Sequence, residues 1–585
     1  MSCFRPFTAS ALALALLLPP CSMAADNERI KAIDAYEHVQ KIRSDVEKIA
    51  NASDASGAAD KDLNGAVTRL LGALDYLARP EIRELAQGSR YLDARRHDVL
   101  FDLAGLYARL GDRQRALDAM EAAMREVVFP TMRQYYTTDK AFASLQDEPR
   151  FRALLAQMDD VEPLWKVPAI ASTYKEKLTA EERVAGLSLF WAEARQNFVN
   201  FDHLPGLNWD QLYLDTLKRV LAVETTRDYY EVMLGFAPLL RDAHTNVYPP
   251  KELDDFFYAR PPMRTRLIED KVLVTQVMSP TLGKQVRVGD EIVSINGQAV
   301  QEYARQHVEP YVSSSTPQDR AVRMYGYQLF SGDSRRAHTL RIRDATGNER
   351  TETIARTGYN DRTSEPDFAF RITPEGIAYF ALDHFESAES VKAFEKILPQ
   401  IMKAKALVID VRANGGGSTN HGLAILSYLT VQPIPLAASR IRRESVYDRA
   451  RGASLMHWGP AGSNTPYARK RDTLFKGPVA VLIGPETFSA AEDFVVSYEL
   501  LNRGLLIGES TAGSTGQPLS FDLPGGGTAR ICIKRDSYPD GRDFVGKGIA
   551  PKIMVKPTVA DLRGRRDAAL ERAVRELGLL VDKPS

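Results

Sequence analysis

Between residues 370 and 560, short apolar runs alternate with segments of helical character. The apolar runs have the length of buried strands. Strands are expected at 376–382, 406–411, 478–483 and 504–508. Helices are expected at 387–403, 419–430 and 489–502. This alternation predicts βαβ units with largely parallel strands, and therefore an α/β domain over residues 365–560.

The first polar loop of this domain follows the strand at 406–411 and contains three consecutive glycines, Gly415 to Gly417. Open α/β sheets place their ligand sites at such a position. Glycines let backbone N–H groups approach a ligand closely, so the loop could stabilise an oxyanion or hold a phosphate. The chain contains no GxxxxGK[ST] motif, which argues against a nucleotide-binding loop. A plain flexible turn is the alternative interpretation.

The second polar loop, residues 484–492, places Ser489 between a strand and a helix. A helix N-terminus presents unpaired N–H groups, so the Ala490 N–H would be an oxyanion donor beside the serine hydroxyl. Ser489 and Glu492 also fit the capping-box pattern S-x-x-E. On this loop alone, the capping interpretation is favoured over a nucleophile.

A nucleophilic serine needs a base that takes its proton and that is held in the right tautomer. The chain has nine histidines, and three of them stand in polar segments where a predicted element ends or begins. These are His244, His384 and His421. A lone histidine is more often structural than catalytic, and spacing alone does not choose among the three.

Helical patterns occupy both ends of the chain. Residues 26–165 are expected to be helical, and 97–125 carries small residues at helical spacing around a Gly111-Asp112 turn. This hairpin resembles one tetratricopeptide unit, with an ordinary helical hairpin as the equal alternative. The region is expected to recruit protein partners. Residues 166–250 predict a helical bundle, and residues 561–585 a charged C-terminal helix that is docked or solvated.

A region of β character lies between the bundle and the α/β domain. In residues 255–350, alternating apolar positions and the turn Asn296-Gly297 predict short strands. The run VRVGDEIVSINGQAV resembles a PDZ domain, which binds extended peptides at a sheet edge. A small β-barrel without a ligand is the alternative. Residues 526–538 predict one further strand.

Residues 1–24 have the layout of a secretory signal peptide, with Arg5, an apolar run at 8–18 and small residues at 22 and 24. The run is shorter than the ~20 residues of a membrane span, and a buried N-terminal helix is the alternative. A lipid anchor at Cys21 is not expected, because prolines fill the two preceding places. The protein is therefore expected to be exported, periplasmic or secreted, with no integral membrane span.

Charge and cysteine content exclude two classes of site. Lys and Arg total 76 and Asp and Glu total 76, so the net charge of zero argues against a nucleic-acid partner held by a broad basic field. The three cysteines form no CxxC pair, which excludes a thiolate zinc site. Neither a metal nor an organic cofactor is expected.

Several sequence motifs follow one another between Leu178 and Thr558. They are FWAEARQNFVNFDHLPGLNWDQLY with LRDAHTNVYPP, then ALVIDVRANGGG, VLIGPETFSAAEDF, GLLIGESTAGSTGQP and GKGIAPKI. In this order they resemble the serine peptidases related to tail-specific (C-terminal processing) proteases, tricorn core proteases and retinoid-binding repeat proteins. The resemblance implies an α/β core of the crotonase/ClpP type with a PDZ-like β domain and an N-terminal all-helical region.

The resemblance implies Ser489 as the nucleophile. In the Ser-Lys branch of the family a lysine serves as base, and here Ser514 stands in its place. The tricorn-like Ser-His branch uses a histidine before the PDZ-like region, and His244 matches that position. The serine that precedes this histidine in the branch is replaced by Ala243. The chain is thus closer to the tricorn-like branch.

A glutamate completes the tricorn-like arrangement, and by spacing its place falls at Val545. Asp543 or Asp540 is expected to substitute for it as the orienting acid. The family's oxyanion hole consists of N–H groups of the glycine loop and of the residue after the serine. These map onto Gly416 and Ala490, with Gly415 as an alternative.

The resemblance therefore implies a secreted or periplasmic serine endopeptidase that hydrolyses polypeptides. The alternative is a catalytically inactive peptide-binding or protein-binding scaffold on the same fold, because Ser514, Ala243 and Val545 depart from the family pattern. A hydrolase of another acyl substrate would use the same serine.

Overall fold

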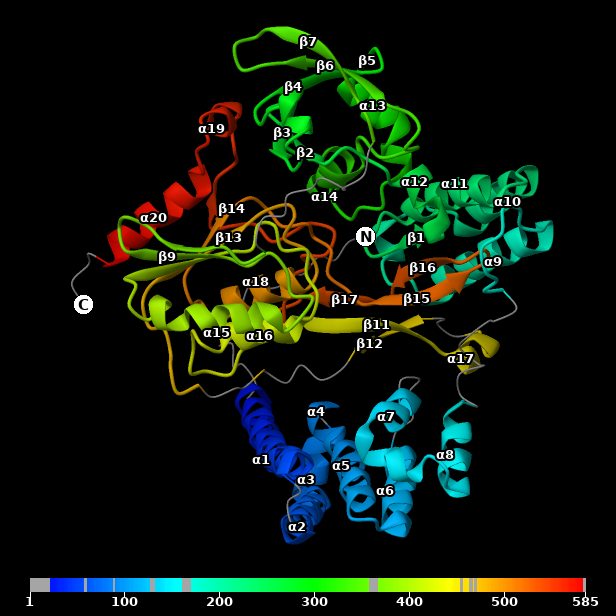
Figure 1. Ribbon diagram of the computed structural model, residues 1–585, viewed down its shortest axis with the longest axis vertical. Coiled ribbons are helices and arrows are strands. Elements are labelled where there is room, and N and C mark those ends of the chain that lie inside the picture. The colour runs from blue at the N-terminus through cyan, green and yellow to red at the C-terminus, as the bar shows by residue number, and fades with distance from the viewer. Residues whose placement is uncertain are drawn as a thin grey trace, which may run out of the picture. The chain divides into compact units, whose positions relative to one another are not determined.

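The computed structural model is drawn as a ribbon in Figure 1. It describes residues 21–56, 60–87, 90–126, 132–159, 170–356, 367–452, 456–461, 467 and 471–581. All but the last four residues of the predicted signal peptide, 1–24, lie outside this description.

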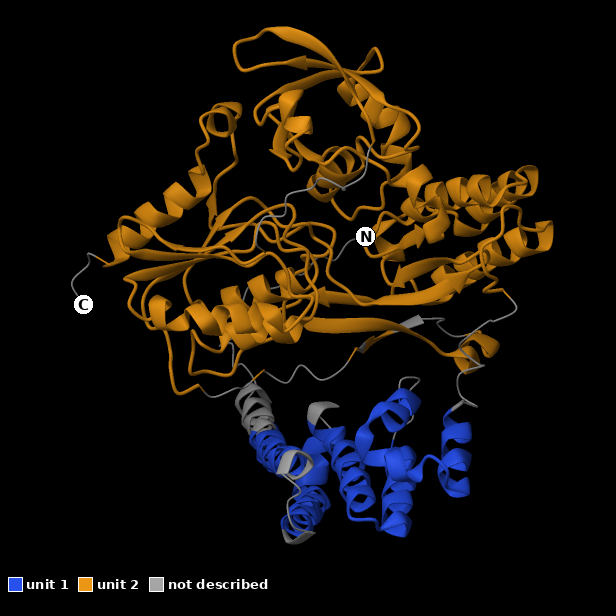
Figure 2. Cartoon of the chain, in the orientation of Figure 1, with its two compact units in different colours: residues 1–158 blue, residues 159–585 orange. Residues whose placement is uncertain are grey.

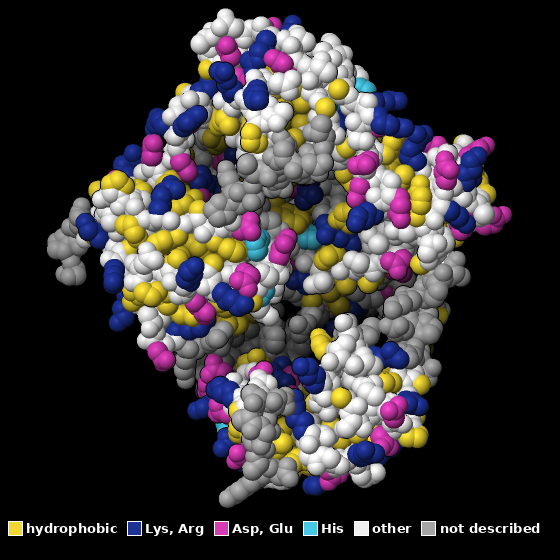
Figure 3. Space-filling model, in the orientation of Figure 1, with side chains coloured by type: hydrophobic (Ala, Val, Ile, Leu, Met, Phe, Trp, Pro, Cys, Tyr) yellow, Lys and Arg dark blue, Asp and Glu magenta, His cyan; other side chains and the backbone are white. Residues whose placement is uncertain are grey.

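The chain divides into two compact units, residues 1–158 and residues 159–585, which are described separately (Figure 2). None of the helices within the described ranges combines the length and the apolar character of a membrane-spanning segment. On the face shown in Figure 3, acidic and basic side chains are interspersed, in keeping with their equal totals of 76.

The first unit is helical throughout its described part, as expected for residues 26–165. Its α-helices are α1 (Cys21–Ser56), α2 (Asp60–Leu77), α3 (Pro80–Gln87), α4 (Arg90–Asp93), α5 (Arg95–Arg109), α6 (Arg113–Glu126), α7 (Met132–Thr138) and α8 (Pro149–Asp159). The hairpin predicted at 97–125 is formed by α5 and α6, and Gly111 has a φ of 74° at its turn. Ala104 and Ala116 are fully buried there, so that the two helices pack closely.

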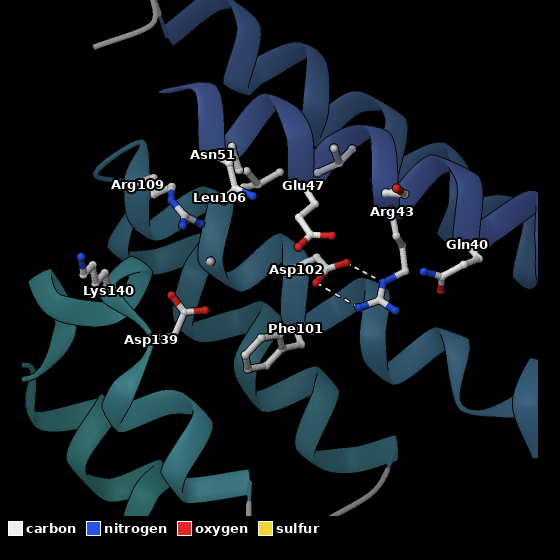
Figure 4. Close-up of a pocket in the computed structure, with 14 residues that line it drawn as sticks. Gln40, Arg43, Glu47, Asn51, Phe101, Asp102, Leu106, Arg109, Asp139 and Lys140 are labelled. Carbon is white, nitrogen blue, oxygen red and sulfur yellow. Dashed lines mark hydrogen bonds and ion pairs between the residues drawn. The ribbon is translucent and has the colours of Figure 1, made fainter. Parts of the chain in front are cut away.

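A cavity of about 450 Å³ opens in this unit between α1, α5 and the start of the 3-10 helix η1 (Lys140–Leu145) (Figure 4). On its wall, the Arg43 guanidinium donates to Asp102 over 2.6 Å and to Asp98 over 3.1 Å. These ion pairs connect α1 to α5. Figure 4 shows Glu47 pointing toward Asp102 from the side of α1.

The second unit is built around a six-stranded sheet in the order β18-β14-β13-β10-β9-β8. Its strands are β8 (Phe370–Ile372), β9 (Ile377–Ala381), β10 (Ala406–Asp410), β13 (Val479–Ile483), β14 (Leu505–Gly508) and β18 (Ile553–Met554). Neighbouring strands pair in parallel, except β8, which pairs antiparallel with β9. The prediction of a largely parallel sheet is confirmed, with β8 as an added edge strand.

Helices cover both faces of this sheet. One face carries α15 (Glu389–Ile401), α16 (Thr419–Leu426) and α18 (Ala490–Leu500), and the other carries α20 (Ala568–Val581) (Figure 1). Successive residues of β10 face opposite sides, as the strand period requires, so Leu407 packs under the first group and Val408 under α20. Because Leu570 and Leu577 are buried on the sheet, the C-terminal helix is a docked element.

The region predicted as a helical bundle contains α9 (Ala180–Asn197), α10 (Trp209–Ala222) and α11 (Thr226–Phe236). Two strands from much later in the chain complete its core, which the sequence did not indicate. These strands are β15 (Pro518–Leu523) and β16 (Gly527–Cys532), and their Leu523 and Ile531 are buried among the helices. The single strand predicted at 526–538 is two strands, β16 and β17 (Lys534–Ser537).

The same strands connect the helical part to the sheet. β16 pairs with β1 (Asn246–Tyr248), and the next strand, β17 (Lys534–Ser537), pairs with β11 (Ala438–Glu444). β11 also pairs with β12 (Met456–Pro460) in a small antiparallel sheet beside the core. One stretch of chain thus reaches from the helices to the α/β core.

A separate β domain lies between these parts in sequence. Its antiparallel sheet has the order β2-β3-β4-β6-β7, from β2 (Met263–Ile268), β3 (Lys271–Val277), β4 (Glu291–Ile295), β6 (His338–Arg343) and β7 (Glu349–Ile354). The predicted tight turn lies between β4 and β5 (Gln298–Ala299), where Asn296 and Gly297 have φ values of 50° and 84°. The sheet and α13 (Val300–His307) share their own apolar core.

Tyr230 on α11 connects the helices to the β15–β16 hairpin. Its buried hydroxyl donates to the Pro524 carbonyl over 2.6 Å and accepts from the Gly527 N–H over 3.1 Å. We expect Tyr230→Phe to lower the free energy of unfolding by about 1–3 kcal/mol, because both partners stay buried without a bond. Urea unfolding followed by tryptophan fluorescence measures this change. The control is Tyr447→Phe, at a side chain that is 68% exposed, with an expected change below about 0.5 kcal/mol. Equal stabilities of the two variants would contradict the assignment.

Candidate active site

Ser489 lies in the turn between β13 and α18. Its backbone has a φ of 59° and a ψ of −125°, a conformation that costs a non-glycine residue energy. In the described structure its side chain makes no capping bond to α18, so the predicted capping box of Ser489 and Glu492 is wrong. The hydroxyl is therefore available to a partner outside the helix.

Of the three candidate histidines, His244 is the one that contacts this hydroxyl. Its Nε2 lies 3.1 Å from Ser489 Oγ, across 245 residues of sequence. The other two bind elsewhere: His421 Nδ1 is 2.9 Å from the Phe385 carbonyl, and His384 Nε2 is 3.7 Å from the Asp367 carboxylate. The structure thus brings together the serine and the histidine that the sequence had singled out separately.

The backbone at His244 is fixed by the buried carboxylate of Asp242. This carboxylate accepts the His244 N–H over 2.9 Å, the Thr245 hydroxyl over 3.0 Å and the Asn200 amide over 3.0 Å. The histidine follows the 3-10 helix η4 (Ala237–Leu240) and lies two residues before β1, so it is held near the start of a paired strand.

The imidazole of His244 is buried, with 3% of its surface exposed. It stacks on Phe488, with ring centroids 4.5 Å apart and an interplanar angle of 16°. Burial lowers the pKa of His244 well below its usual value, and the charges of Arg530, Arg323 and Lys534 lower it further. The ring is therefore neutral near pH 7, which is the state that can accept a proton.

The second ring nitrogen faces a hydroxyl. His244 Nδ1 lies 3.1 Å from Ser514 Oγ, and both side chains are buried. The expected orienting acids lie elsewhere, since Asp543 pairs with Arg440 over 3.2 Å and Asp540 with Arg542 over 2.7 Å. The placement of an acid at Asp543 or Asp540 is corrected accordingly, because these arginines already hold both carboxylates.

Glu492 lies beneath this pair and is fully buried. Its carboxylate accepts hydrogen bonds from the hydroxyls of Thr511 and Thr515 and from the N–H groups of Gly513 and Ser514. Burial raises the pKa of Glu492 to about 7, and these donors counteract the shift. The sequence indicated this residue as a capping partner, whereas its side chain binds the loop that carries Ser514.

The glycine loop packs directly against the serine. A Cβ at Gly416, whose φ is 94°, would lie 2.7 Å from Ser489 Cβ and 2.8 Å from the Phe488 carbonyl. The Gly416 N–H, expected as an oxyanion donor, instead donates to the Asn414 side chain over 2.9 Å. The N–H groups of Gly415 and Ala490 have no acceptor among the described residues. These two are the better candidates for an oxyanion site.

Metal ligation has no visible basis at this site. Within the described ranges, no group of three or more His, Cys, Asp or Glu side chains is arranged to hold a metal ion. The chemistry that the arrangement does support is proton transfer between a serine hydroxyl and a neutral imidazole.

The contact of Gly416 with Ser489 yields a test. We expect Gly416→Ala to displace the Ser489 turn and to slow its labelling by a fluorophosphonate at least about 10²-fold, since an added methyl group has no room. The rate of labelling followed by mass spectrometry measures the effect. The matched control is Gly415→Ala, where nothing lies within 4 Å of the added Cβ, and it should label at the wild-type rate. Equal rates for both variants would contradict the packing argument.

Residues 376–555 match the family described as Peptidase family S41. The matched span contains the glycine loop, Ser489 and Ser514, while His244 lies before it. The family model therefore covers the α/β core and the nucleophile loop.

Individual relatives agree with this match. A carboxyl-terminal-processing protease of Picosynechococcus sp. is 23% identical over 383 residues, which cover 62% of this chain and 81% of the relative. The solved structure of mature CPAF complexed with lactacystin is 16% identical, with a TM-score of 0.54, and the alignment covers 69% of this chain and 98% of CPAF. The crystal structure of mature CPAF gives 16% identity, a TM-score of 0.53, and coverage of 69% and 97%. At this identity the two CPAF structures show likeness of fold.

The family match and the protease relative agree with the geometry at Ser489, where a hydroxyl on a strained turn meets a neutral imidazole. The α/β core over residues 376–555 is therefore similar to peptidase family S41, and the chain is a serine-type peptidase.

Proposed function

We propose that this protein is a serine endopeptidase in which Ser489 attacks the peptide carbonyl carbon and His244 is the general base. The observation that carries the proposal is the 3.1 Å contact between His244 Nε2 and Ser489 Oγ. The lowered pKa of His244 supports it, because an unprotonated ring nitrogen must face the hydroxyl before the attack.

In this mechanism His244 Nε2 takes the hydroxyl proton as the Oγ–carbon bond forms, and later gives it to the leaving amine. Water then repeats the sequence on the acyl-enzyme and releases the free serine. The Ala490 N–H, at the start of α18, would donate to the oxyanion together with an N–H of the glycine loop. The unoccupied Gly415 N–H favours Gly415 over Gly416 for the second donor.

A lysine base is the alternative within the family, and Lys534 is a half-buried lysine of this region. Burial lowers the pKa of Lys534, but Asp536 and Asp493 outweigh it and raise the pKa above the usual value. Its ammonium lies 2.8 Å from the Asp536 carboxylate. A lysine held in its charged form does not accept a proton, which supports the Ser-His assignment.

The proposed substrates are polypeptides, and the name of the carboxyl-terminal-processing relative suggests that their C-terminal segments are cut. The β domain between β2 and β7 is the proposed peptide-binding module of PDZ type, with a strand added at a sheet edge. Its α14 segment (Pro317–Ala321) and the residues just before it reach the site, where the Thr316 hydroxyl donates to the Ala512 carbonyl over 2.7 Å. The Ala243 N–H donates to Ser315 Oγ over 3.0 Å.

The first unit is the proposed recruiting surface for protein partners. Its helical hairpin and the cavity beside α5 are the surfaces proposed for this contact. Residues 1–24 support export of the protein to the periplasm or medium.

The catalytic assignment predicts the effect of two substitutions. Ser489→Ala and His244→Ala should each lower the rate of casein or peptide hydrolysis about 10⁴-fold or more, because the nucleophile and base act as a unit. Thermal unfolding should stay near that of the wild type for Ser489→Ala. The control is His384→Ala, a histidine outside the site, which should keep full activity. Hydrolysis by Ser489→Ala at the wild-type rate would rule out the mechanism.

An inactive scaffold would behave differently in the same assays. It would bind peptides without hydrolysis, and a fluorophosphonate would leave Ser489 unlabelled. Labelling of the wild type that is lost in His244→Ala therefore distinguishes the enzyme from the scaffold.

Export predicts a shortened N-terminus. When the full chain is expressed in a Gram-negative host, N-terminal sequencing of the periplasmic or secreted protein should begin at Ala25. An intact N-terminus on protein that stays in the cytoplasm would contradict the proposal.

A further inference from the structure

The second ring nitrogen of His244, Nδ1, has an unusual hydrogen-bond partner. In serine peptidases a buried acid usually holds the second ring nitrogen, fixing the tautomer that leaves Nε2 free to accept a proton. Among the described residues no carboxylate hydrogen bonds to His244 Nδ1, and the Ser514 hydroxyl occupies that position at 3.1 Å.

We propose that Ser514 and Glu492 together replace this acid as positioning residues. Ser514 accepts the hydrogen bond from the Nδ1–H of His244, and Glu492 fixes Ser514 in place. This inference rests on the proposed roles of Ser489 and His244. It adds two residues to the site, neither of which touches the substrate.

The hold of Glu492 on the Ser514 loop is complete at both carboxylate oxygens. Oε1 accepts from the Thr511 hydroxyl over 2.6 Å and from the Gly513 N–H over 2.7 Å. Oε2 accepts from the Ser514 N–H over 2.8 Å and from the Thr515 hydroxyl over 3.1 Å. One buried carboxylate thus fixes four residues of this loop. One of them is Ser514, whose hydroxyl contacts the His244 ring.

The same carboxylate belongs to the first turn of the helix that carries the nucleophile. The Glu492 N–H donates to the Ser489 carbonyl over 2.8 Å, and the Ser489 N–H donates to the Ser514 carbonyl over 3.3 Å. Backbone hydrogen bonds therefore connect Ser489 both to Glu492 and to Ser514. A shift of Glu492 would move both ends of the proton path.

The ionised form of Glu492 suits these four donors, because a protonated oxygen would point its own hydrogen at an N–H or a hydroxyl. Protonation near pH 7, where burial places the pKa, should therefore loosen the loop. Two other titratable groups lie close to Glu492. Asp493 is the next residue on α18, and burial together with the charge of Asp536 raises its pKa to about 6. His244 lies on the other side of Ser514. The four groups that donate to the Glu492 carboxylate are all uncharged.

The test compares Ser514→Ala, Glu492→Gln and the double variant in hydrolysis of a fluorogenic peptide by the full-length protein. We expect Ser514→Ala and Glu492→Gln each to lower kcat about 10- to 100-fold with KM nearly unchanged. This is less than the ~10⁴-fold cost of a lost triad aspartate, because the serine hydroxyl is neutral. The double variant should be at most about twofold slower than the slower single variant, since both act through one bond. Ser520→Ala, an exposed serine on β15, is the matched control and should keep wild-type kinetics.

The pH profile separates positioning from general stability. The wild-type rate should fall as the pH drops through about 7, whereas Glu492→Gln should stay at its low rate throughout that range. Asp493→Asn should keep the fall, because the loop is held by the neighbouring carboxylate. Thr515→Val removes one of the four bonds, and its rate should lie between those of the wild type and Glu492→Gln. This variant replaces Glu492→Gln in the test if Glu492→Gln does not fold.

Wild-type kinetics in Ser514→Ala would overturn the proposal, as would rate losses that multiply in the double variant. If the fall in rate near pH 7 disappeared in Asp493→Asn, the role of Glu492 would also be overturned. Failure of the proposed function would appear separately, as a wild-type protein that neither hydrolyses peptides nor is labelled at Ser489.

Discussion

The hydrogen bond between His244 and Ser489 joins residues 245 positions apart, and most of the second unit serves to hold its two ends. Ser489 is fixed by the parallel sheet and α18, whereas His244 belongs to the helical part that precedes the β domain. The strand β16 bridges these parts. It pairs with β1 directly after His244, and the Cys532 N–H donates to the Thr245 hydroxyl over 3.2 Å.

The turn at Ser489 is strained, and its surroundings supply the compensation. A non-glycine residue in such a conformation costs about 1–3 kcal/mol and persists where neighbouring contacts over-determine it. Here the Phe488 N–H donates to the Asn414 carbonyl over 3.0 Å, and the Thr487 hydroxyl to the Val411 carbonyl over 2.7 Å. Both acceptors belong to the strand end and glycine loop beside the serine. The fixed turn keeps the hydroxyl directed at the imidazole.

The sequence predicted the parts of the molecule that depend on local pattern. Alternating strands and helices indicated the parallel sheet. Asn296-Gly297 indicated a tight turn in the separate β domain. Ser489 was recognisable, although the capping pattern with Glu492 competed, because both interpretations need the same residues at a helix start. The choice of His244 over His384 and His421 came from the family resemblance and not from spacing.

The features of the fold and site that could not be predicted from the sequence depend on long-range contacts. The strands β15 and β16 complete the core of helices that lie almost 300 positions earlier, and no local pattern encodes such pairing. Ser514 stood out as a replaced lysine, but its contact with Nδ1 depends on the fold. The orienting acid was expected near Val545 because family spacing alone located it, whereas the arginines Arg440 and Arg542 bind those aspartates.

The late arrival of β15 and β16 has a consequence for biosynthesis. A ribosome adds roughly 5–20 residues per second, so about 15 to 60 s separate the emergence of α11 from that of the hairpin that covers it. During this interval the apolar faces of the three helices lack their strands, and the histidine has no anchored position. On the proposed mechanism, a nascent chain gains a base beside its serine only once nearly the whole polypeptide has been translated.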